Sequence, residues 1–156
     1  FRDEKLTTRI HEFADSDKFN TLRSLAFFAE FSDAEIWEVA RISSWRHCAV
    51  GEMLTKEGEP GTFFGILASG QVKVTKRGKL LNILGPGECF GEMAYLSKAA
   101  QVRGADVTVL DEAKIISIPT QGLAEASDAC RHNFDHAFLQ ILVERLSMAN
   151  IRLSGV

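Results

Sequence analysis

One carboxylate and one guanidinium stand out in a stretch of small residues, CFGEMAYLSKAAQVRGADV, at positions 89–107. A short helix that begins near Gly91 would point free backbone N–H groups and the positive end of its dipole at one spot, which suits an anion. The planar fork of Arg103 suits two phosphate oxygens. Glu92 would repel a phosphate unless neighbouring hydroxyl groups donated to it. The stretch therefore predicts a cradle for a sugar phosphate.

An ordinary ion pair is the alternative explanation of these two charges. Arginines in loops commonly pair with acids, and a Glu92–Arg103 pair would hold the loop shut. The residue types by themselves favour this ion pair over the cradle. Both arrangements remain open at this point.

Patterns for catalysis and metal binding are sparse. A cupin enzyme needs several histidine ligands on its strands, but the strand-rich region contains only His47. His132 and His136 lie four residues apart, near Asp135 and Cys130, and this spacing permits a metal site. Solvated polar residues at a helix start explain the pair better, because the ligand set is incomplete. With no nucleophile elbow and no P-loop, the sequence predicts a non-catalytic protein without metal or cofactor.

Length and composition fit one globular domain of 156 residues. Lys and Arg total 18 against 21 for Asp and Glu, a net charge of -3, which argues against nucleic-acid binding. No apolar run is long enough to span a bilayer, so no membrane partner is expected. The three cysteines, Cys48, Cys89 and Cys130, are odd in number and lack metal spacing, so we expect reduced thiols in a cytoplasmic protein. The first residue, Phe1, indicates a piece of a longer protein.

From about Ser44 the sequence consists of short β-rich segments between turn signals. Two hairpins are predicted, one around Ser69-Gly70 in ILASGQVKV and one near Gly78 in KVTKRGKLLNIL. Many short antiparallel strands at close spacing predict a sandwich, jelly roll or small barrel. The expected strands are SWRHCAV, EMLTK, TFFGILA, QVKVTK, LLNIL, VRGADVTVL and AKIISI.

Helices are predicted on both sides of the β-rich region. Before it, Ser32 and Glu35 have the spacing of a capping box at the start of an amphipathic helix. After it, a short helix is expected over 119–126, and Asn133 is the expected cap of a long helix that ends near Leu153.

The long last helix carries two apolar stripes. One has the three-and-four spacing of a coiled-coil seam. Packing on the domain's own core and pairing with a second chain both remain open, because so few heptads make a marginal coiled coil. The seam consists of Leu139, Leu142, Leu146, Ala149 and Leu153, and the adjoining stripe of Phe134, Phe138 and Ile141.

The run FGEMAYL, followed by an arginine and small residues, is similar to the phosphate-binding cassette of cyclic nucleotide-binding domains. GEMLTKEGEPGTFFGILASGQVKVTKRG resembles the glycine-punctuated strands of that family, and LRSLAFFAEFSDAEIWEVA resembles its first helices. The resemblance covers about residues 21–153. It implies a mainly β fold with flanking helices: an eight-stranded antiparallel jelly roll (a double-stranded β-helix) with N-terminal helices and a long C-terminal helix at about 133–153. Residues 1–20 would then be a helical extension and 21–156 the domain.

The resemblance also implies a role for each residue of the cassette. It assigns Glu92 to the ribose 2′-hydroxyl and Arg103 to the cyclic phosphate. In the family the last helix caps the base, and Phe134 and Phe138 are the candidates here. Backbone groups that would complete the cradle are those of Gly91, Met93, Ala94, Gly104 and Ala105.

Two departures from the family pattern concern affinity. Val102 stands where a proline is usual, and the spacing from Glu92 to Arg103 is longer than usual, so Arg103 is expected to be less well placed before ligand arrives. Family members that favour cyclic GMP (cGMP) often place a hydroxyl residue straight after the arginine, and that position is Gly104 here, so the resemblance implies cyclic AMP (cAMP) in preference to cGMP.

The expected function is that of a regulatory module, of the catabolite-activator or protein kinase regulatory subunit type. It would relay ligand binding through its last helix to an effector domain or to the partner in a homodimer. The alternative is a degenerate cassette that serves only dimerisation or protein interaction.

Overall fold

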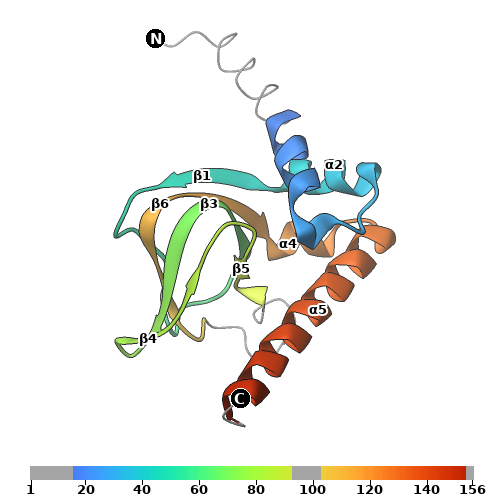
Figure 1. Ribbon diagram of the computed structural model, residues 1–156. Helices are drawn as coiled ribbons and strands as arrows, with labels where there is room; N and C mark the ends of the chain where they lie inside the picture. The colour runs from blue at the N-terminus through green and yellow to red at the C-terminus, as the bar shows by residue number, and fades with distance from the viewer. Residues whose placement is uncertain (1–15, 93–102, 154–156) are drawn as a thin grey trace, which may run out of the picture.

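The protein combines an antiparallel sheet with helices that gather on one side of it (Figure 1). The computed structural model describes residues 16–92 and 103–153. In chain order the elements are a helix over 16–24, η1 (Ala26–Phe28), α2 (Asp33–Ile42), β1 (Ser44–Cys48), β2 (Met53–Thr55), β3 (Phe63–Lys76), β4 (Lys79–Leu84), β5 (Cys89–Phe90), β6 (Asp106–Pro119), α4 (Thr120–Ala124) and α5 (Asp128–Leu153).

Two strands of 14 residues each, β3 and β6, form the centre of the sheet. They pair from Phe63–Pro119 to Thr75–Asp106, and the order β1-β6-β3-β4 puts β1 and β4 outside them. β2 also pairs with β6, and β5 with β3. The antiparallel sheet with flanking helices confirms the predicted fold class. The described residues contain six strands instead of the expected eight, because segments expected as separate strands are continuous in β3 and β6.

The predicted hairpin at Ser69-Gly70 is wrong. β3 continues through these residues, and its register against β6 shifts on both sides of Ser69 and again after Gln71. Gly70 has a φ of +86°, and a Cβ there would collide with the carbonyl oxygen of Glu112 and with Ala113. The glycine marks a bulge where two backbones approach closely, and a bulge gives the same sequence signal as a turn.

The second predicted hairpin, near Gly78, is confirmed. β3 and β4 pair as far as Lys76–Lys79, which leaves Arg77 and Gly78 as a two-residue turn. Their φ angles of +52° and +80° are both positive, as a type I′ turn requires.

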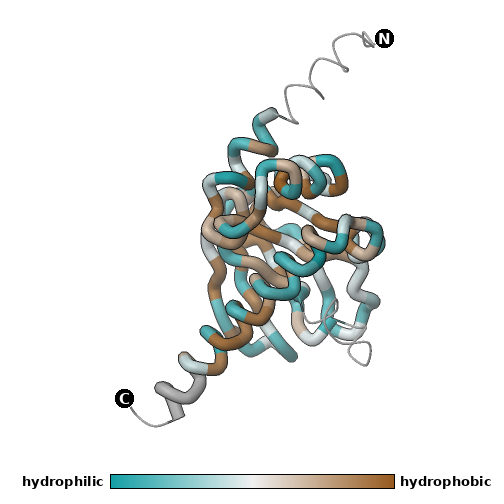
Figure 2. The backbone as a smooth tube through the Cα atoms, turned by 90° about the vertical axis from the view of Figure 1, so that its right-hand side faces the viewer, coloured by the Kyte–Doolittle hydropathy of each residue, from teal (hydrophilic) through white to brown (hydrophobic). Residues whose placement is uncertain are grey.

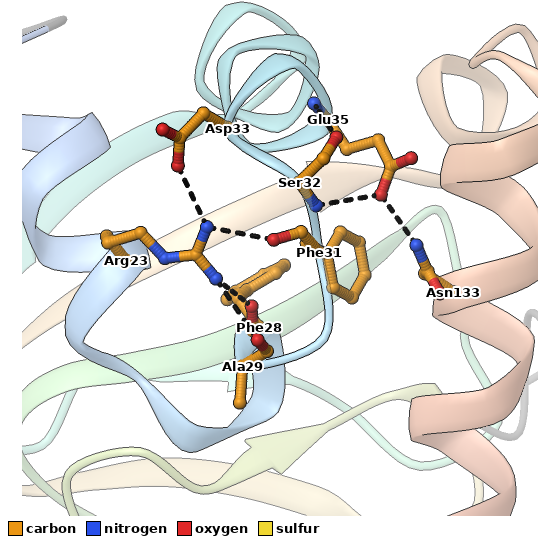
Figure 3. Close-up of polar contacts among 8 residues, drawn as sticks. All are labelled: Arg23, Phe28, Ala29, Phe31, Ser32, Asp33, Glu35 and Asn133. Carbon is orange, nitrogen blue, oxygen red and sulfur yellow. Dashed lines mark hydrogen bonds and ion pairs between the residues drawn. The ribbon is translucent and has the colours of Figure 1, made fainter.

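One guanidinium holds the connection from the first described helix to α2 (Figure 3). Arg23 donates to the carbonyl oxygens of Phe28 at 2.6 Å and Phe31 at 2.8 Å, and its distance to the Asp33 carboxylate is 3.1 Å. Carbonyl groups at the end of a helical turn lack partners within it, so a side-chain donor stabilises the turn. The helix over 16–24 spans the expected domain boundary at residue 20, and that boundary stays a prediction.

Two glutamates of α2 join that helix to the start of α5. Ser32 and Glu35 form the predicted capping box, and the Glu35 carboxylate also accepts a hydrogen bond from Asn133 Nδ2 at 2.6 Å (Figure 3). The Glu38 carboxylate accepts from the Ser127 N–H at 2.9 Å and from the Ser127 hydroxyl at 2.7 Å. The first turns of α5 are therefore tied to α2 by side-chain hydrogen bonds.

The last helix begins earlier than predicted. It starts at Asp128, and the Ser127 hydroxyl accepts from the Cys130 N–H at 3.2 Å. Ser127 is thus the N-cap, while Asn133 lies within the helix and binds Glu35. Serine and asparagine are equally good caps, so the sequence signal was ambiguous, and the contact of Ser127 with α2 decides between them.

The two apolar stripes of α5 have different surroundings. Phe134 and Phe138 are fully buried between the helices and the sheet, where the ring centroid of Phe138 lies 4.7 Å from that of Phe64. Leu139 and Leu146, from the predicted seam, are 58% and 63% exposed. Figure 2 shows hydrophobic segments recurring along α5 where it crosses the front of the molecule. The phenylalanine stripe therefore packs on the domain's own core, whereas Leu139 and Leu146 of the seam face solvent in the single chain.

None of the described helices has both the length and the apolar character that crossing a membrane requires.

Candidate functional site

A cavity of about 390 Å³ lies between β4, β5, the start of β6 and α5. A volume in this range is typical of small-molecule sites. The two charged residues predicted from the sequence, Glu92 and Arg103, both line it. The other lining residues are Thr55, Val74, Leu81, Asn82, Leu84, Cys89, Phe90, Gly91, Gly104, Ala105, Val107 and Arg145.

Arg103 is a buried cation with no anionic partner among the described residues. The residue is 6% exposed. Its Nη2 donates to the Phe63 carbonyl oxygen at 2.5 Å and its Nη1 to the Gly91 carbonyl oxygen at 3.5 Å, while the guanidinium carbon lies 4.8 Å from the centre of the Phe63 ring. No described carboxylate pairs with it, and burial lowers the pKa of its guanidinium. A buried charge is costly unless it is paired, so an anion in the cavity would stabilise this group.

The backbone around Arg103 fixes the direction of its side chain. Its N–H donates to the Glu59 carbonyl oxygen at 2.7 Å, and its own carbonyl oxygen accepts from the Gly58 N–H at 2.8 Å. Gly91 has a φ of +89°, and a Cβ there would collide with Nη1 of Arg103. The space that a side chain at Gly91 would occupy is thus filled by the Arg103 guanidinium.

Glu92 is also buried, at 3% exposure, but its partner comes from the last helix. One of its carboxylate oxygens, Oε1, accepts from Nη1 of Arg145, and Nη2 of Arg145 donates to the Cys89 carbonyl oxygen at 3.0 Å. The Glu92–Arg103 ion pair that the residue types favoured is therefore absent from the described structure. The second carboxylate oxygen of Glu92 has no hydrogen-bond partner among the described residues and is available to a donor in the cavity.

A known protein family matches the part of the chain that forms the sheet and carries Glu92 and Arg103. The sequence model of the cyclic nucleotide-binding domain matches residues 45–129. The chain belongs to that family. The match begins in β1 and ends in the first turn of α5, so it contains the whole sheet and both ends of the cassette.

Relatives of this cyclic nucleotide-binding domain occur within larger proteins. The chain is 29% identical over 152 residues, 97% of its length, to the cGMP-dependent protein kinase of Toxoplasma gondii, of which it spans 14%. It is 30% identical over 111 residues, 68% of its length, to the CRP-like cAMP-activated global transcriptional regulator of Mycobacterium tuberculosis, of which it spans 48%. The chain thus spans less than half the length of these relatives.

A solved structure confirms the fold. The structure described as Sp-2Cl-cAMPS bound to PKAR CBD2 superposes on this chain with a TM-score of 0.73 at 20% identity, and the match covers 94% of each chain. The arrangement of sheet and flanking helices is therefore that of cyclic nucleotide-binding domains.

The domain brings together some of the predicted site residues and separates others. Gly104 and Ala105 line the cavity, and Thr55 Oγ1 donates to the Ala105 carbonyl oxygen at 3.2 Å. Met93 and Ala94 lie outside the described residues. The two base-capping candidates, Phe134 and Phe138, are 0% exposed in the core and do not line the cavity. Their burial against other aromatic rings leaves them no face for a base in this arrangement.

Arg145 is the charged residue of the cavity lining that sequence reasoning missed. It lies 53 residues after Glu92 in the chain, on a helix that was analysed only for its apolar stripes. A cation in an otherwise apolar neighbourhood of the seam was the available signal, but it gave no indication of its partner.

The other predicted groups do not form a second site. The three cysteines are free and buried, and burial raises the pKa values of Cys89 and Cys130 to about 12. Among the described residues, no three His, Cys, Asp or Glu side chains gather closely enough to hold a metal ion.

Proposed function

We propose that this domain binds a cyclic nucleotide in the cavity, with the cyclic phosphate on Arg103 and the ribose 2′-hydroxyl on Glu92. The observation that carries the proposal is the buried Arg103 guanidinium, which faces a cavity and has no anionic partner among the described residues. The second carboxylate oxygen of Glu92, which has no hydrogen-bond partner among the described residues, supplies an acceptor for a sugar hydroxyl in the same cavity. A non-catalytic role fits a site whose described residues include neither a nucleophile–base pair nor a metal cluster.

The ligand is cAMP in preference to cGMP. The residue after the arginine, Gly104, has no side chain, and nothing described lies within 4 Å of where a Cβ would be. Thr108, which could have met a guanine amino group, does not line the cavity, whereas Thr55 does and already donates to Ala105. The names of the relatives include both nucleotides. A competition titration in which cGMP binds more tightly would overturn this choice.

Arg145 supplies the route by which the ligand acts on the last helix. It is the described α5 residue that reaches the cavity, and it holds the carboxylate that would bind the ribose. Binding at Glu92 therefore changes the environment of a helix whose exposed seam can contact an effector domain or a second copy of the chain. A ligand shifts such a helix only by binding one of its positions more tightly than the other.

The free thiols support the predicted cytoplasmic location.

Calorimetric titration of cAMP into the wild type and Arg103→Lys tests the proposal. Lysine keeps the charge but loses the planar fork, and a charge-assisted hydrogen bond contributes about 1.5–3 kcal/mol. Arg103→Lys should therefore weaken binding by about one to two decades. Arg46→Lys is the matched control, because Arg46 is exposed and forms its ion pair with Glu52. Equal affinities in all three proteins would show that Arg103 does not bind the ligand. A wild type that binds no cyclic nucleotide would favour the alternative, a degenerate cassette that serves only dimerisation or protein interaction.

A further inference from the structure

The two faces of the β3–β4 hairpin differ in what they contact. Val74 pairs with Asn82 and Thr75 pairs with Leu80, so Leu81 has no partner on β3 and forms a β-bulge. The bulge puts Leu81 and Asn82 on the cavity side. Leu80 and Ile83 line no described cavity and are 58% and 43% exposed. A ligand in the cavity would cover Leu81 but leave these two aliphatic side chains in water.

Four cations lie on this hairpin, where Lys73 is paired with Ile83 across the strands and Lys76 with Lys79. Lys73, Lys76, Arg77 and Lys79 lie on the same hairpin, and none of them pairs with a described acid. The chain as a whole carries a net charge of -3, so this concentration of positive charge is local. We call these four cations together with Leu80 and Ile83 the hairpin patch.

The turn residue Arg77 adds a conformational argument. It has a φ of +52° and is the only non-glycine residue with positive φ among the described residues. The first position of a type I′ turn favours Asn, Asp or Gly, and an arginine there carries a conformational cost. The turn between Lys76 and Lys79 holds an arginine despite that cost, which points to a use for the charge.

We propose that the hairpin patch docks an extended acidic segment of another protein, which adds as a strand to the free edge of β4. β4 is an outer strand whose described partner is β3, so the hydrogen-bonding groups on its other edge are available. The Ile83 N–H donates to the neighbouring Asn82 side chain at 2.9 Å, and a docked strand can replace that contact. Alternating apolar residues of the segment would cover Leu80 and Ile83, and its acids would face the cations.

Two other anionic partners fit less well. A lipid surface could accept the cations and the aliphatic side chains, but hydrocarbon cannot satisfy the backbone groups of an open strand edge. Nucleic acid would satisfy the cations, but it offers nothing apolar to cover Leu80 and Ile83, and the domain is acidic overall. A protein strand meets all three demands.

Nuclear magnetic resonance titration of the isotope-labelled domain tests the docking. The probe is a synthetic peptide of alternating valine and glutamate, and the control is the same peptide with lysine in place of glutamate. We expect backbone amide shifts concentrated in residues 76–84 with the acidic peptide, weakening as salt is added. No shift with the acidic peptide, or equal shifts with both peptides, would overturn the proposal.

Three variants separate the patch from its surroundings. Arg77→Gly suits the turn and removes the guanidinium, so it should weaken peptide binding by about two- to fivefold without lowering the melting temperature. Ile83→Thr keeps a β-branched strand residue but removes apolar contact, and it should also weaken binding. Arg46→Gln, which removes an exposed cation outside the patch, should have no effect. Peptide affinity that is unchanged by Arg77→Gly and Ile83→Thr would contradict the assignment.

Anionic partners of the other classes are tested in parallel. Vesicles of phosphatidylcholine with phosphatidylserine, and a short DNA duplex, are titrated against the same labelled domain. Binding of either one to residues 76–84 in preference to the acidic peptide would overturn the choice of a protein partner. Because Arg103→Lys leaves the hairpin intact, it should not change peptide binding, so failure of the nucleotide site and failure of this proposal are distinguishable.

Discussion

The two halves of α5 are held in different ways. The first half is tied to α2 by Ser127 and Asn133 and is buried in the core through Phe134 and Phe138. The second half exposes Leu146 of the apolar seam, and its described polar contacts with the sheet region come from Arg145. The first half thus belongs to the core, whereas the second half depends on a contact inside the candidate ligand site. A helix built in this way can respond to ligand at one end without unfolding at the other.

The largest effect should come from the buried half. Phe138→Ala removes a fully buried ring, and such substitutions lower the free energy of unfolding by about 3–5 kcal/mol. Leu146→Ala, on the exposed half, should change it by less than about 0.5 kcal/mol. Urea denaturation of both variants measures the difference. Similar losses in the two variants would show that the halves of α5 are equally part of the core.

The next effect concerns ligand affinity. Arg145→Gln removes the described partner that positions the Glu92 carboxylate, which is proposed to accept from the ribose, so cAMP binding should weaken by about tenfold. A 2′-deoxy analogue, which lacks the donor to Glu92, should lose less. Arg131→Gln is the control on the same helix, because Arg131 pairs with Asp128 at the exposed start of α5. Tighter binding by Arg145→Gln would show instead that Arg145 competes with the ligand for Glu92.

Thiol labelling compares the two halves directly. Cys130 lies in the first turn of α5 and is buried in the core, and the Cys89 carbonyl oxygen accepts a hydrogen bond from Arg145 of the second half. Burial raises both thiol pKa values to about 12, so both cysteines should react slowly with iodoacetamide at mildly alkaline pH. Arg145→Gln should speed the labelling of Cys89 several-fold and leave Cys130 protected, as measured by mass spectrometry. Equal acceleration at the two sites would indicate global and not local opening.

The same pKa shifts make the free energy of unfolding depend on pH. An unfolded cysteine thiol has a pKa of about 8.5, so between that value and about 12 the unfolded chain releases protons that the folded chain retains. The stability that protonated Cys89 and Cys130 contribute is complete below the lower value and decreases as the pH rises through this window.

The smallest effect on folding is expected in the seam. Leu142→Asp together with Leu146→Asp should leave the chain folded, because Leu146 is exposed and Leu142 only half-buried. If the seam joins two copies, the double variant should be a monomer in light scattering and should bind ligand with altered affinity. A wild type that is already monomeric at high concentration, with and without ligand, would exclude the homodimer.

Local signals in the sequence predicted local structure well. The capping box at Ser32 and the turn at Gly78 are confirmed because each depends on residues within a few positions of one another. Gly70 was misjudged because its close approach is to Glu112 and Ala113 on another strand, which no local pattern records.

The same limit applies to the candidate site. Glu92 and Arg103 were predicted to share one site because they flank one stretch, and both line one cavity. The partner of Glu92 could not be predicted, because Arg145 reaches it only after α5 has packed across the sheet. The positions of Phe134 and Phe138 followed from the helical period, whereas the choice between core and ligand depended on the surrounding rings.

The pairing of the two long strands also bears on how the molecule assembles. Thr75 pairs with Asp106, so β4, β5, Glu92 and Arg103 all lie in the loop that this pairing closes. Contacts between residues so far apart in the chain raise the contact order, and high contact order slows folding. We expect the cradle to form only after this slow closure is complete. A cyclic nucleotide would then draw the equilibrium toward the folded chain by mass action without speeding the step that builds its own site.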